Sequence, residues 1–290
     1  MIVGFLCLSI SITCSILVSI ILKKNANKID LSEIILINYI IAAFFSLLSF
    51  RIYTEYYLIY MVSGDLHTIL IIGCLLPLGF ISMAQSIKYF GVAKSEIFQR
   101  MSIVIPIIAS FIIFNDKGCS IKTIQIIIAI FSIFLLLDKQ QKHILEEKTF
   151  SDFKWPVLVC LTYGICDILF KKISSNNSLT NCLFLSFLIA SIVMVIYIST
   201  IKKQFHFSKN NIINGLLIGA LNWVNIISYI KAHKYLNNMP STVFIVMNLG
   251  VVISGTIVGI FLFKEQLNKN NILGIFMAIL SILISIKIRA

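Results

Sequence analysis

A carboxylate lies near the middle of a long apolar stretch of this chain. Tyr163, Asp167 and Lys171 follow one another at four-residue spacing, which places them on one face of a helix. Removal from water favours the neutral form of a carboxylic acid, unless a nearby cation such as Lys171 holds it charged. The spacing therefore predicts one of two roles for Asp167. It binds a cation or a proton, or it forms an intrahelical ion pair whose lysine extends to the polar surface.

Arg100 is a second charged side chain within an apolar stretch, where it directly follows Gln99. A guanidinium keeps its charge inside a protein, so Arg100 would bind an anionic group of a substrate or pair with Asp167. The alternative is that the apolar stretch starts after Arg100, which would then lie at the level of the lipid headgroups. A later stretch carries Asn248, which we expect to face Gln99 and Arg100.

Another stretch carries four polar side chains on one helical stripe, at positions i, i+3, i+7 and i+11: Asn222, Asn225, Tyr229 and His233. Amide and phenol groups can hydrogen-bond a polar solute without the cost of a buried charge. The alternative is that they bond to neighbouring helices, as polar groups in membrane bundles often do. We interpret the first three as lining a cavity, and we expect His233 to face the membrane interface.

Gln85 lies one turn from Lys88 and Tyr89, and we expect it to face the same solute while Lys88 anchors its helix at the surface. Pro77 and Pro106 predict local kinks or unwinding, because proline lacks the amide hydrogen. The predicted substrate-binding residues are Gln85, Gln99, Arg100, Tyr163, Asp167, Asn222, Asn225, Tyr229 and Asn248.

The composition is that of an integral membrane protein. Of the 290 residues, 59% are hydrophobic and 12% are charged, whereas a soluble domain has about 25% charged residues. The mean hydropathy is +0.98. The net charge of +12 arises from Lys and Arg in short connections between apolar runs, which excludes a nucleic-acid-binding module. The seven cysteines form no CxxC pair, so neither a disulfide framework nor a metal site is predicted.

An all-helical fold is predicted, because the apolar runs are long enough to cross a bilayer as helices. Ten runs can be marked, at 2–22, 33–52, 68–90, 93–114, 120–137, 155–173, 180–201, 211–236, 240–263 and 271–288. They divide the chain into a first half over 1–138, a polar linker over 139–154 and a second half over 155–290.

The two halves resemble each other in sequence. Residues 73–89 align with 219–235 at an offset of 146, and residues 115–116 align with 264–265 at an offset of 149. A repeat of five runs crosses the membrane an odd number of times, so the second copy must be inverted relative to the first. Inverted repeats around a site near the bilayer midplane are common in secondary transporters.

Two segments carry a resemblance to a known family. Residues 95–106 read SEIFQRMSIVIP, and residues 240–274 contain a Lys-Glu pair that closes the apolar run and a glycine nine residues after it. With these motifs the chain resembles ten-span members of the drug/metabolite transporter superfamily, with two EamA-type repeats over almost its whole length. The first copy departs from the pattern, since Asp116 replaces the glutamate and Gln125 replaces the glycine.

The resemblance implies a central cavity lined by the first, third, fourth, sixth, eighth and ninth runs, with the fifth and tenth outside. It also implies transport by alternating access and cytoplasmic termini. Lys and Arg are instead more frequent in the connections that favour external termini, so the two indications of sidedness disagree. Gly255 and Gly259, four residues apart, predict the close approach of another helix.

We therefore predict a secondary-active transporter of a small polar or amphipathic metabolite or drug, driven by a proton or solute gradient, with Asp167 as the proton-coupling residue. The alternatives are a lipid-carrier flippase of the same fold and an intramembrane enzyme. The sequence has no GxxxxGK[ST] loop and no HExxH motif, so no catalytic residue, metal or cofactor is predicted. The predicted partners are a small-molecule substrate, the lipid bilayer and a proton. The predicted location is a bacterial inner membrane, and the chain is expected to be a monomer or a homodimer.

Overall fold

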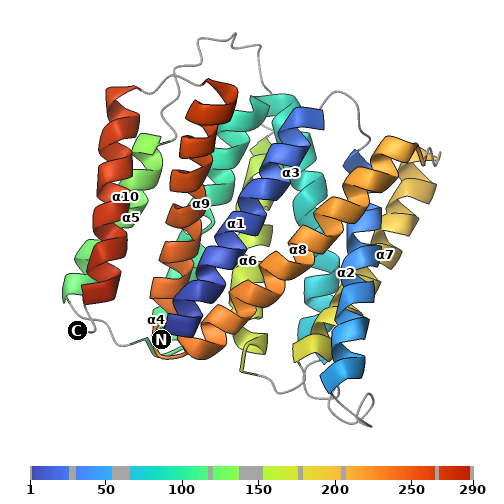
Figure 1. Ribbon diagram of the computed structural model, residues 1–290, viewed down its shortest axis with the longest axis horizontal. Coiled ribbons are helices and arrows are strands. Elements are labelled where there is room, and N and C mark those ends of the chain that lie inside the picture. The colour runs from blue at the N-terminus through green and yellow to red at the C-terminus, as the bar shows by residue number, and fades with distance from the viewer. Residues whose placement is uncertain are drawn as a thin grey trace. The chain divides into compact units, whose positions relative to one another are not determined.

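The computed structural model describes residues 2–25, 31–53, 66–116, 120–136, 153–175, 179–203, 207–264 and 268–287. These residues form helices and no strand, which confirms the all-helical prediction for this part of the chain. The helices are α1 (Ile2–Asn25), α2 (Leu31–Tyr53), α3 (Leu66–Met101), α4 (Val104–Ile112), α5 (Ser120–Leu136), α6 (Lys154–Ile173), α7 (Leu179–Tyr197) with a π-helical end, η2 (Ile198–Lys202), α8 (Lys209–Tyr235), α9 (Pro240–Phe263) and α10 (Lys269–Lys287) (Figure 1). The polar linker, apart from Phe153 and Lys154, lies outside the described residues.

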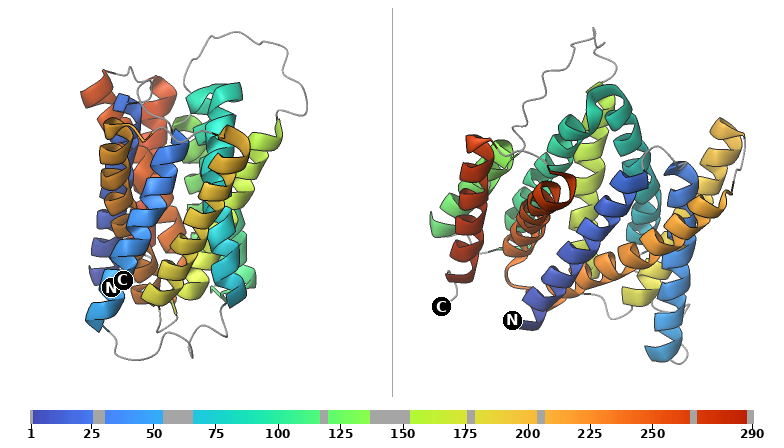
Figure 2. Two further views of the ribbon diagram at one scale, coloured as in Figure 1. Left: turned by 90° about the vertical axis from the view of Figure 1, so that its right-hand side faces the viewer. Right: turned by 45° about the horizontal axis from the view of Figure 1, so that its top comes forward.

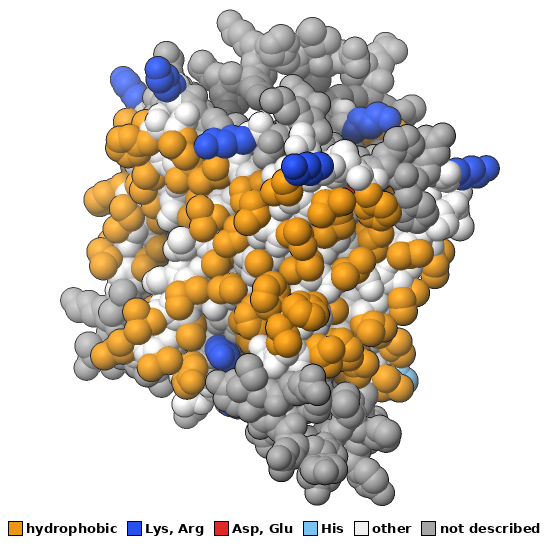
Figure 3. Space-filling model, turned by 45° about the vertical axis from the view of Figure 1, so that its right-hand side comes forward, with side chains coloured by type: hydrophobic (Ala, Val, Ile, Leu, Met, Phe, Trp, Pro, Cys, Tyr) orange, Lys and Arg blue, Asp and Glu red, His pale blue; other side chains and the backbone are white. Residues whose placement is uncertain are grey.

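Six helical segments are long and apolar enough to cross a membrane by length and composition: Ile2–Leu22, Leu31–Ser49, Leu66–Phe90, Leu179–Lys202, Lys209–Tyr235 and Pro240–Leu262. Shorter apolar helices are Phe98–Ile112, Ile121–Leu136 and Lys269–Ile284. On the face drawn in Figure 3, hydrophobic side chains predominate and Lys and Arg side chains gather mainly along the upper edge. Exposed lysines such as Lys24, Lys209 and Lys269 stand at helix ends, where their charge can reach a polar interface.

The helical segment α3 contains a reversal of chain direction. Ser86 and Ser95 are nine residues apart, so a straight helix would separate them by about 13.5 Å along its axis. Their hydroxyl oxygens instead lie 2.7 Å apart, and both side chains are buried. The segment must therefore fold back between them, as the two limbs joined at an apex in the right-hand view of Figure 2 show. The reversal falls where the sequence predicts the connection between the runs 68–90 and 93–114.

Helical hydrogen bonding is interrupted between α3 and α4, at Ser102 and Ile103. Pro106 has no amide hydrogen, so the Ser102 carbonyl accepts instead from the amide of Ile105, three residues on, at 3.1 Å. The Ile103 amide donates a hydrogen bond to the backbone carbonyl of Arg100, and the Ser102 hydroxyl donates one to the Gln99 carbonyl at 2.5 Å. The unwinding predicted next to Pro106 is thus confirmed, whereas Pro77 lies inside α3.

The helices group into two compact units. The first consists of Met1–Ile81 and Leu169–Tyr235, and the second of Ser82–Ile168 and Leu236–Ala290. The first unit therefore contains α1, α2, α7 and α8 with the ends of α3 and α6, and the second contains α4, α5, α9 and α10 with the remainder of α3 and α6. Each unit combines segments from both halves of the chain.

Glycines hold the helices of the first unit close together. A Cβ atom at Gly73 of α3 would lie 2.7 Å from Ile189 and 3.0 Å from the Ser186 carbonyl oxygen, both on α7. A Cβ atom at Gly219 of α8 would lie 2.8 Å from Ile41 and 3.0 Å from the carbonyl oxygen of Asn38, both on α2. A real Cβ atom does not fit at such distances, so both helix crossings require glycine.

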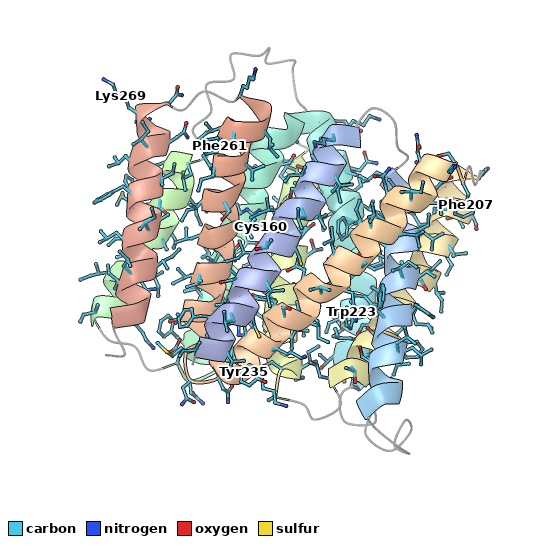
Figure 4. The ribbon with its side chains drawn as sticks, in the orientation of Figure 1. Cys160, Phe207, Trp223, Tyr235, Phe261 and Lys269 are labelled. Atoms are coloured by element: carbon cyan, nitrogen blue, oxygen red, sulfur yellow. The ribbon has the colours of Figure 1, made fainter. Side chains whose placement is uncertain are left out.

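Aromatic contacts complete the core of the first unit. Tyr39 of α2 is fully buried and stacks on Phe187 with ring centroids 6.4 Å apart. Trp223 of α8 lies 5.5 Å from the ring of Phe45 and donates a hydrogen bond from its indole nitrogen to the Ser46 hydroxyl at 2.9 Å (Figure 4). The tryptophan thus buries its ring against α2 and satisfies its polar group there.

In the second unit, α5 and α10 pack against each other, and α9 packs against α4, α5 and α10. Gly274 of α10 permits this packing, since a Cβ atom there would lie 2.8 Å from the Leu136 side chain and 2.9 Å from its amide nitrogen. Asn271 donates hydrogen bonds to the Leu135 and Leu136 carbonyls at 3.1 and 2.9 Å, and so satisfies the otherwise unpaired carbonyl end of α5.

Candidate functional site

The candidate site of the second unit is built around the interruption between α3 and α4. Gly164 of α6 lies directly against it: a Cβ atom there would be 2.7 Å from Ile105 and 3.0 Å from the Ser102 carbonyl oxygen. Any side chain at this position would force α6 away. The glycine therefore brings the backbone of α6 onto the segment in which the helical hydrogen bonds are disturbed.

This contact brings Arg100 close to the polar face of α6. Tyr163 directly precedes Gly164 and Asp167 follows it by three residues, so both flank the contact. Arg100 is two residues before Ser102, and its charge interacts electrostatically with the Tyr163 hydroxyl. Arg100, Tyr163 and Asp167 are all partly exposed within the protein. The arrangement places a fixed cation, a phenol and a carboxylate on neighbouring elements.

Three further predicted residues belong to the same unit. Gln85 and Gln99 of α3 are partly exposed. Asn248 of α9 is buried, and its amide donates to the Phe244 carbonyl of its own helix at 3.1 Å. The expectation that Asn248 faces Gln99 and Arg100 remains a prediction, because the observed hydrogen bond of its amide is local.

The polar stripe of α8 belongs to the first unit and bonds to neighbouring helices. Asn222 donates to the Asn38 side-chain oxygen of α2 at 3.1 Å. Asn225 accepts a hydrogen bond from the Ser11 hydroxyl of α1 at 2.5 Å. These are the helix–helix bonds given above as the alternative to a cavity. Both asparagines are partly exposed within the protein.

One expectation for the end of α8 is wrong, and the surface position that one of the two alternatives gave to Lys171 at the end of α6 is not observed. His233 does not face the membrane interface: its exposed fraction is 0%, and its ring lies 4.9 Å from that of Tyr229, which is 5% exposed. Lys171 does not extend to the surface: its exposed fraction is 4%. Each residue lies near the end of an apolar run, which suggested a position at the membrane surface. In the structure, packing against neighbouring helices buries both side chains. Lys88, by contrast, is exposed as predicted and lies 5.9 Å from the Tyr89 ring centroid.

The prediction for Gly255 is also wrong. No atom of the described residues lies within 4 Å of a Cβ atom built at Gly255, and the residue is exposed. Within the described structure, no helix makes the close approach that its four-residue spacing to Gly259 predicts. The small-residue pattern cannot by itself distinguish a helix contact from a gap in the packing of side chains.

A buried ion pair in the second unit was not predicted from the sequence. Asp116 follows α4 and lies 2.5 Å from the Lys122 ammonium of α5, and the exposed fractions of the two side chains are 0% and 9%. The Ser241 amide and hydroxyl at the start of α9 both donate to the same carboxylate. The six-residue spacing of Asp116 and Lys122 across a turn was the available signal, but it does not reveal burial. Among the described residues, no group of three His, Cys, Asp or Glu side chains could hold a metal ion.

Comparison with known proteins identifies the family. A sequence model described as the EamA-like transporter family matches residues 154–287. The chain belongs to the EamA-like transporter family. It is therefore a multi-pass membrane protein of a transporter family in the drug/metabolite transporter superfamily. The match covers the second half, where the sequence pattern is better preserved than in the copy that carries Asp116 and Gln125.

Two further similarities extend over almost the whole EamA-like chain. An uncharacterized protein of Haemophilus influenzae is 36% identical over 280 residues, covering 94% of each chain. A solved crystal structure matches with a TM-score of 0.74 and 5% sequence identity, and the match covers 99% of this chain and 98% of that chain. At this identity the second similarity concerns the fold alone, and the first indicates a bacterial membrane setting.

Proposed function

We propose that this EamA-like protein is a secondary-active transporter that moves a small polar or amphipathic solute by alternating access. The observation that supports the proposal is the contact of Gly164 with the interruption at Ser102, because Arg100 lies on one side of this contact and Tyr163 and Asp167 lie on the other. Interrupted helices beside charged side chains are a recurrent feature of transporter binding sites. Ionisable groups within membrane segments generally mark the path of a substrate or an ion.

The proposal assigns different roles to the two charges. Arg100 cannot release its proton, so it serves as a fixed cation that orients an anionic or polar group of the solute. Asp167 can exchange a proton with water, so it couples solute movement to a proton gradient. The Tyr163 hydroxyl serves as a hydrogen-bond donor or acceptor for the solute.

The proposal includes ten membrane spans in two inverted repeats. Two matched features support this arrangement. Gly73 packs against α7 and Gly219 packs against α2. In both contacts the glycine faces an isoleucine side chain and the backbone carbonyl of the residue three positions before that isoleucine. The helices α4 and α9 are each followed by a residue with a left-handed backbone, Asn115 with φ of 50° and Lys264 with φ of 54°. These two residues also align at the offset of 149.

The test is transport by the purified full chain in sealed proteoliposomes across an imposed pH gradient. A panel of metabolites and drugs is first screened for thermal stabilisation, because a ligand of the folded state raises stability. With a hit as substrate, we expect Asp167→Asn to abolish the dependence of uptake on the pH gradient. The matched control is Glu33→Gln, which also neutralises a carboxylate. Glu33 is buried at the start of α2, where it accepts a hydrogen bond from Asn211 at 2.6 Å.

An unchanged rate and pH profile in Asp167→Asn would refute proton coupling through this residue. Turnover of the solute in detergent, without a sealed membrane, would instead indicate an enzyme and would contradict transport itself.

A further inference from the structure

A polar seam lies in the first unit, where α8 packs against both α1 and α2. Asn222 and Asn225 are three residues apart on α8, which places them on one side of that helix. Asn222 donates to the side-chain oxygen of Asn38 on α2 at 3.1 Å, and Asn225 accepts from the Ser11 hydroxyl of α1. We call these four residues the amide seam, because three of them are asparagines that meet between three helices.

The side-chain nitrogen of Asn38 has no hydrogen-bond partner among the described residues, although Asn38 is only 1% exposed. Turning both carboxamides of the pair around would leave one polar atom of Asn38 unpaired in the same way, because the pair shares a single hydrogen bond. Burial of an amide group without a hydrogen bond is costly and therefore rare in native proteins. An unpaired one behind partly exposed polar groups indicates a position where a partner from outside the chain binds.

The asparagines of α8 offer further hydrogen-bonding atoms at the same place. Each makes one hydrogen bond within the described structure, which leaves the Asn222 oxygen and the Asn225 nitrogen available. Side chains three residues apart on a helix are separated by about 5–6 Å, so one small group can contact both. With the nitrogen of Asn38, the amide seam offers two donors and one acceptor and carries no charge. An amide or imide group is its complement, because its carbonyl oxygens accept and its N–H group donates.

Helix packing holds the amide seam in position. A Cβ atom at Gly219 would lie 3.0 Å from the carbonyl oxygen of Asn38, so the backbones of α8 and α2 are in close contact beside the asparagine pair. Trp223 directly follows Asn222, and its indole nitrogen donates to the Ser46 hydroxyl of α2 (Figure 4). This bond fixes the rotation of α8 against α2. Polar groups held in this way lose little conformational freedom when they bind a ligand.

We propose that Asn38, Asn222 and Asn225 bind a neutral amide or imide group of the solute, of the kind that carboxamides and pyrimidine bases carry. This inference deepens the proposed transport function and rests on it, because it names the chemical class of the solute. A charged group would lose more hydration at this seam than uncharged amides return, so the seam selects neutral groups. The competing role is structural: the three amides only join α8 to α1 and α2, and water completes their hydrogen bonds.

The experiment measures thermal unfolding of the full chain in detergent with increasing nicotinamide or uracil. Each compound is compared with its methylated analogue, N,N-dimethylnicotinamide or dimethyluracil methylated on both ring nitrogens, which keeps the carbonyl groups but lacks the N–H donors. We expect at least one parent compound to raise the melting temperature saturably, because a ligand of the folded state adds stability. Its analogue should bind at least about twofold more weakly, since it loses a hydrogen bond between neutral groups.

Matched variants separate solute binding from a structural role. Asn38→Leu combined with Asn222→Leu removes both carboxamides of the pair and leaves no unpaired partner, so the double variant should fold with nearly unchanged stability. It should bind the parent compound about tenfold or more weakly, since two hydrogen bonds are lost. Asn225→Ala should weaken binding about two- to tenfold. Asn214→Leu is the control, because it removes a carboxamide of α8 that donates to the Asn210 carbonyl of its own helix.

The inference is overturned if neither parent compound stabilises the wild type, which would indicate that the amide seam binds water only. It is also overturned if the methylated analogues stabilise equally, if the double variant responds as the wild type does, or if the control loses the response equally. If the double variant does not fold, the comparison of analogues on the wild type and the response of Asn225→Ala decide the question.

Failure of this site can be told apart from failure of the transport function. Uptake of another solute in dependence on the pH gradient, by a chain that does not respond to either amide, refutes the amide site alone. Absence of uptake of every solute in sealed proteoliposomes refutes the transport proposal, whereas the response to amides in detergent still decides whether the site exists.

Discussion

The side chains of Arg100 and Asp167 differ in one property: Asp167 can become neutral by binding a proton, whereas Arg100 stays charged. The guanidinium of Arg100 is permanently charged, and Gly164 brings its segment against α6. We expect Arg100→Gln to reduce uptake of anionic solutes tenfold or more and uptake of neutral solutes little, because one charge-assisted hydrogen bond contributes about 1.5–3 kcal/mol. Competition between matched anionic and neutral solutes in proteoliposomes measures this. Arg100→Lys, which retains the charge, is the control, and an equal loss for all solutes would indicate a role in folding instead.

The buried ion pair of Asp116 and Lys122 permits a residue-scale prediction of stability. Asp116→Ala leaves the Lys122 ammonium buried and removes the acceptor of the Ser241 amide and hydroxyl. Breaking a buried pair in this way costs about 3–5 kcal/mol. We therefore expect a clear fall in the unfolding temperature in detergent. Asp116→Ala combined with Lys122→Met should recover part of the loss, and a double variant less stable than the single one would contradict this account.

At the scale of the helices, three glycines provide a matched comparison. Gly73→Ala and Gly219→Ala place a Cβ atom within 2.8 Å of an isoleucine on the facing helix, whereas Gly255→Ala meets no atom within 4 Å. We expect the first two to destabilise the protein by about 1–3 kcal/mol through overpacking. Gly255→Ala should be neutral or stabilising by up to about 1 kcal/mol, because alanine favours the helix. Thermal unfolding of the three variants checks this, and a destabilising Gly255→Ala would show that a partner covers this face.

Much of the fold at this scale could be predicted from the sequence. The reversal between Ser86 and Ser95 and the interruption beside Pro106 follow from local chemistry, a change in hydropathy and a missing amide hydrogen. The burial of Lys171 and His233 could not be predicted, because it depends on which helices meet at the ends of α6 and α8. For the same reason, the sequence could not decide whether Asn222 and Asn225 line a cavity or form hydrogen bonds to neighbouring helices.

At the scale of the whole molecule, the two-repeat proposal makes a prediction about access to water. It pairs Asn248 with Gln99, and both should react with a water-soluble thiol reagent when replaced by cysteine in a protein whose native cysteines have been removed. Ile257 is 43% exposed within the protein and apolar, so a cysteine there should contact lipid and react slowly. The rates of labelling in membranes measure this. Lipid exposure of both polar positions would refute the proposed repeat.

The composition of the two compact units has a consequence for the biogenesis of the protein. Glu33 and Asn38 enter the membrane early in synthesis, but their partners Asn211 and Asn222 lie 178 and 184 residues later. At a synthesis rate of about 5–20 residues per second, roughly 10–40 seconds pass before the partners of these polar groups are made. During this time the first helices expose polar side chains to lipid or to the insertion machinery. A fragment ending after α5 would thus contain every helix of the first half but could complete neither unit.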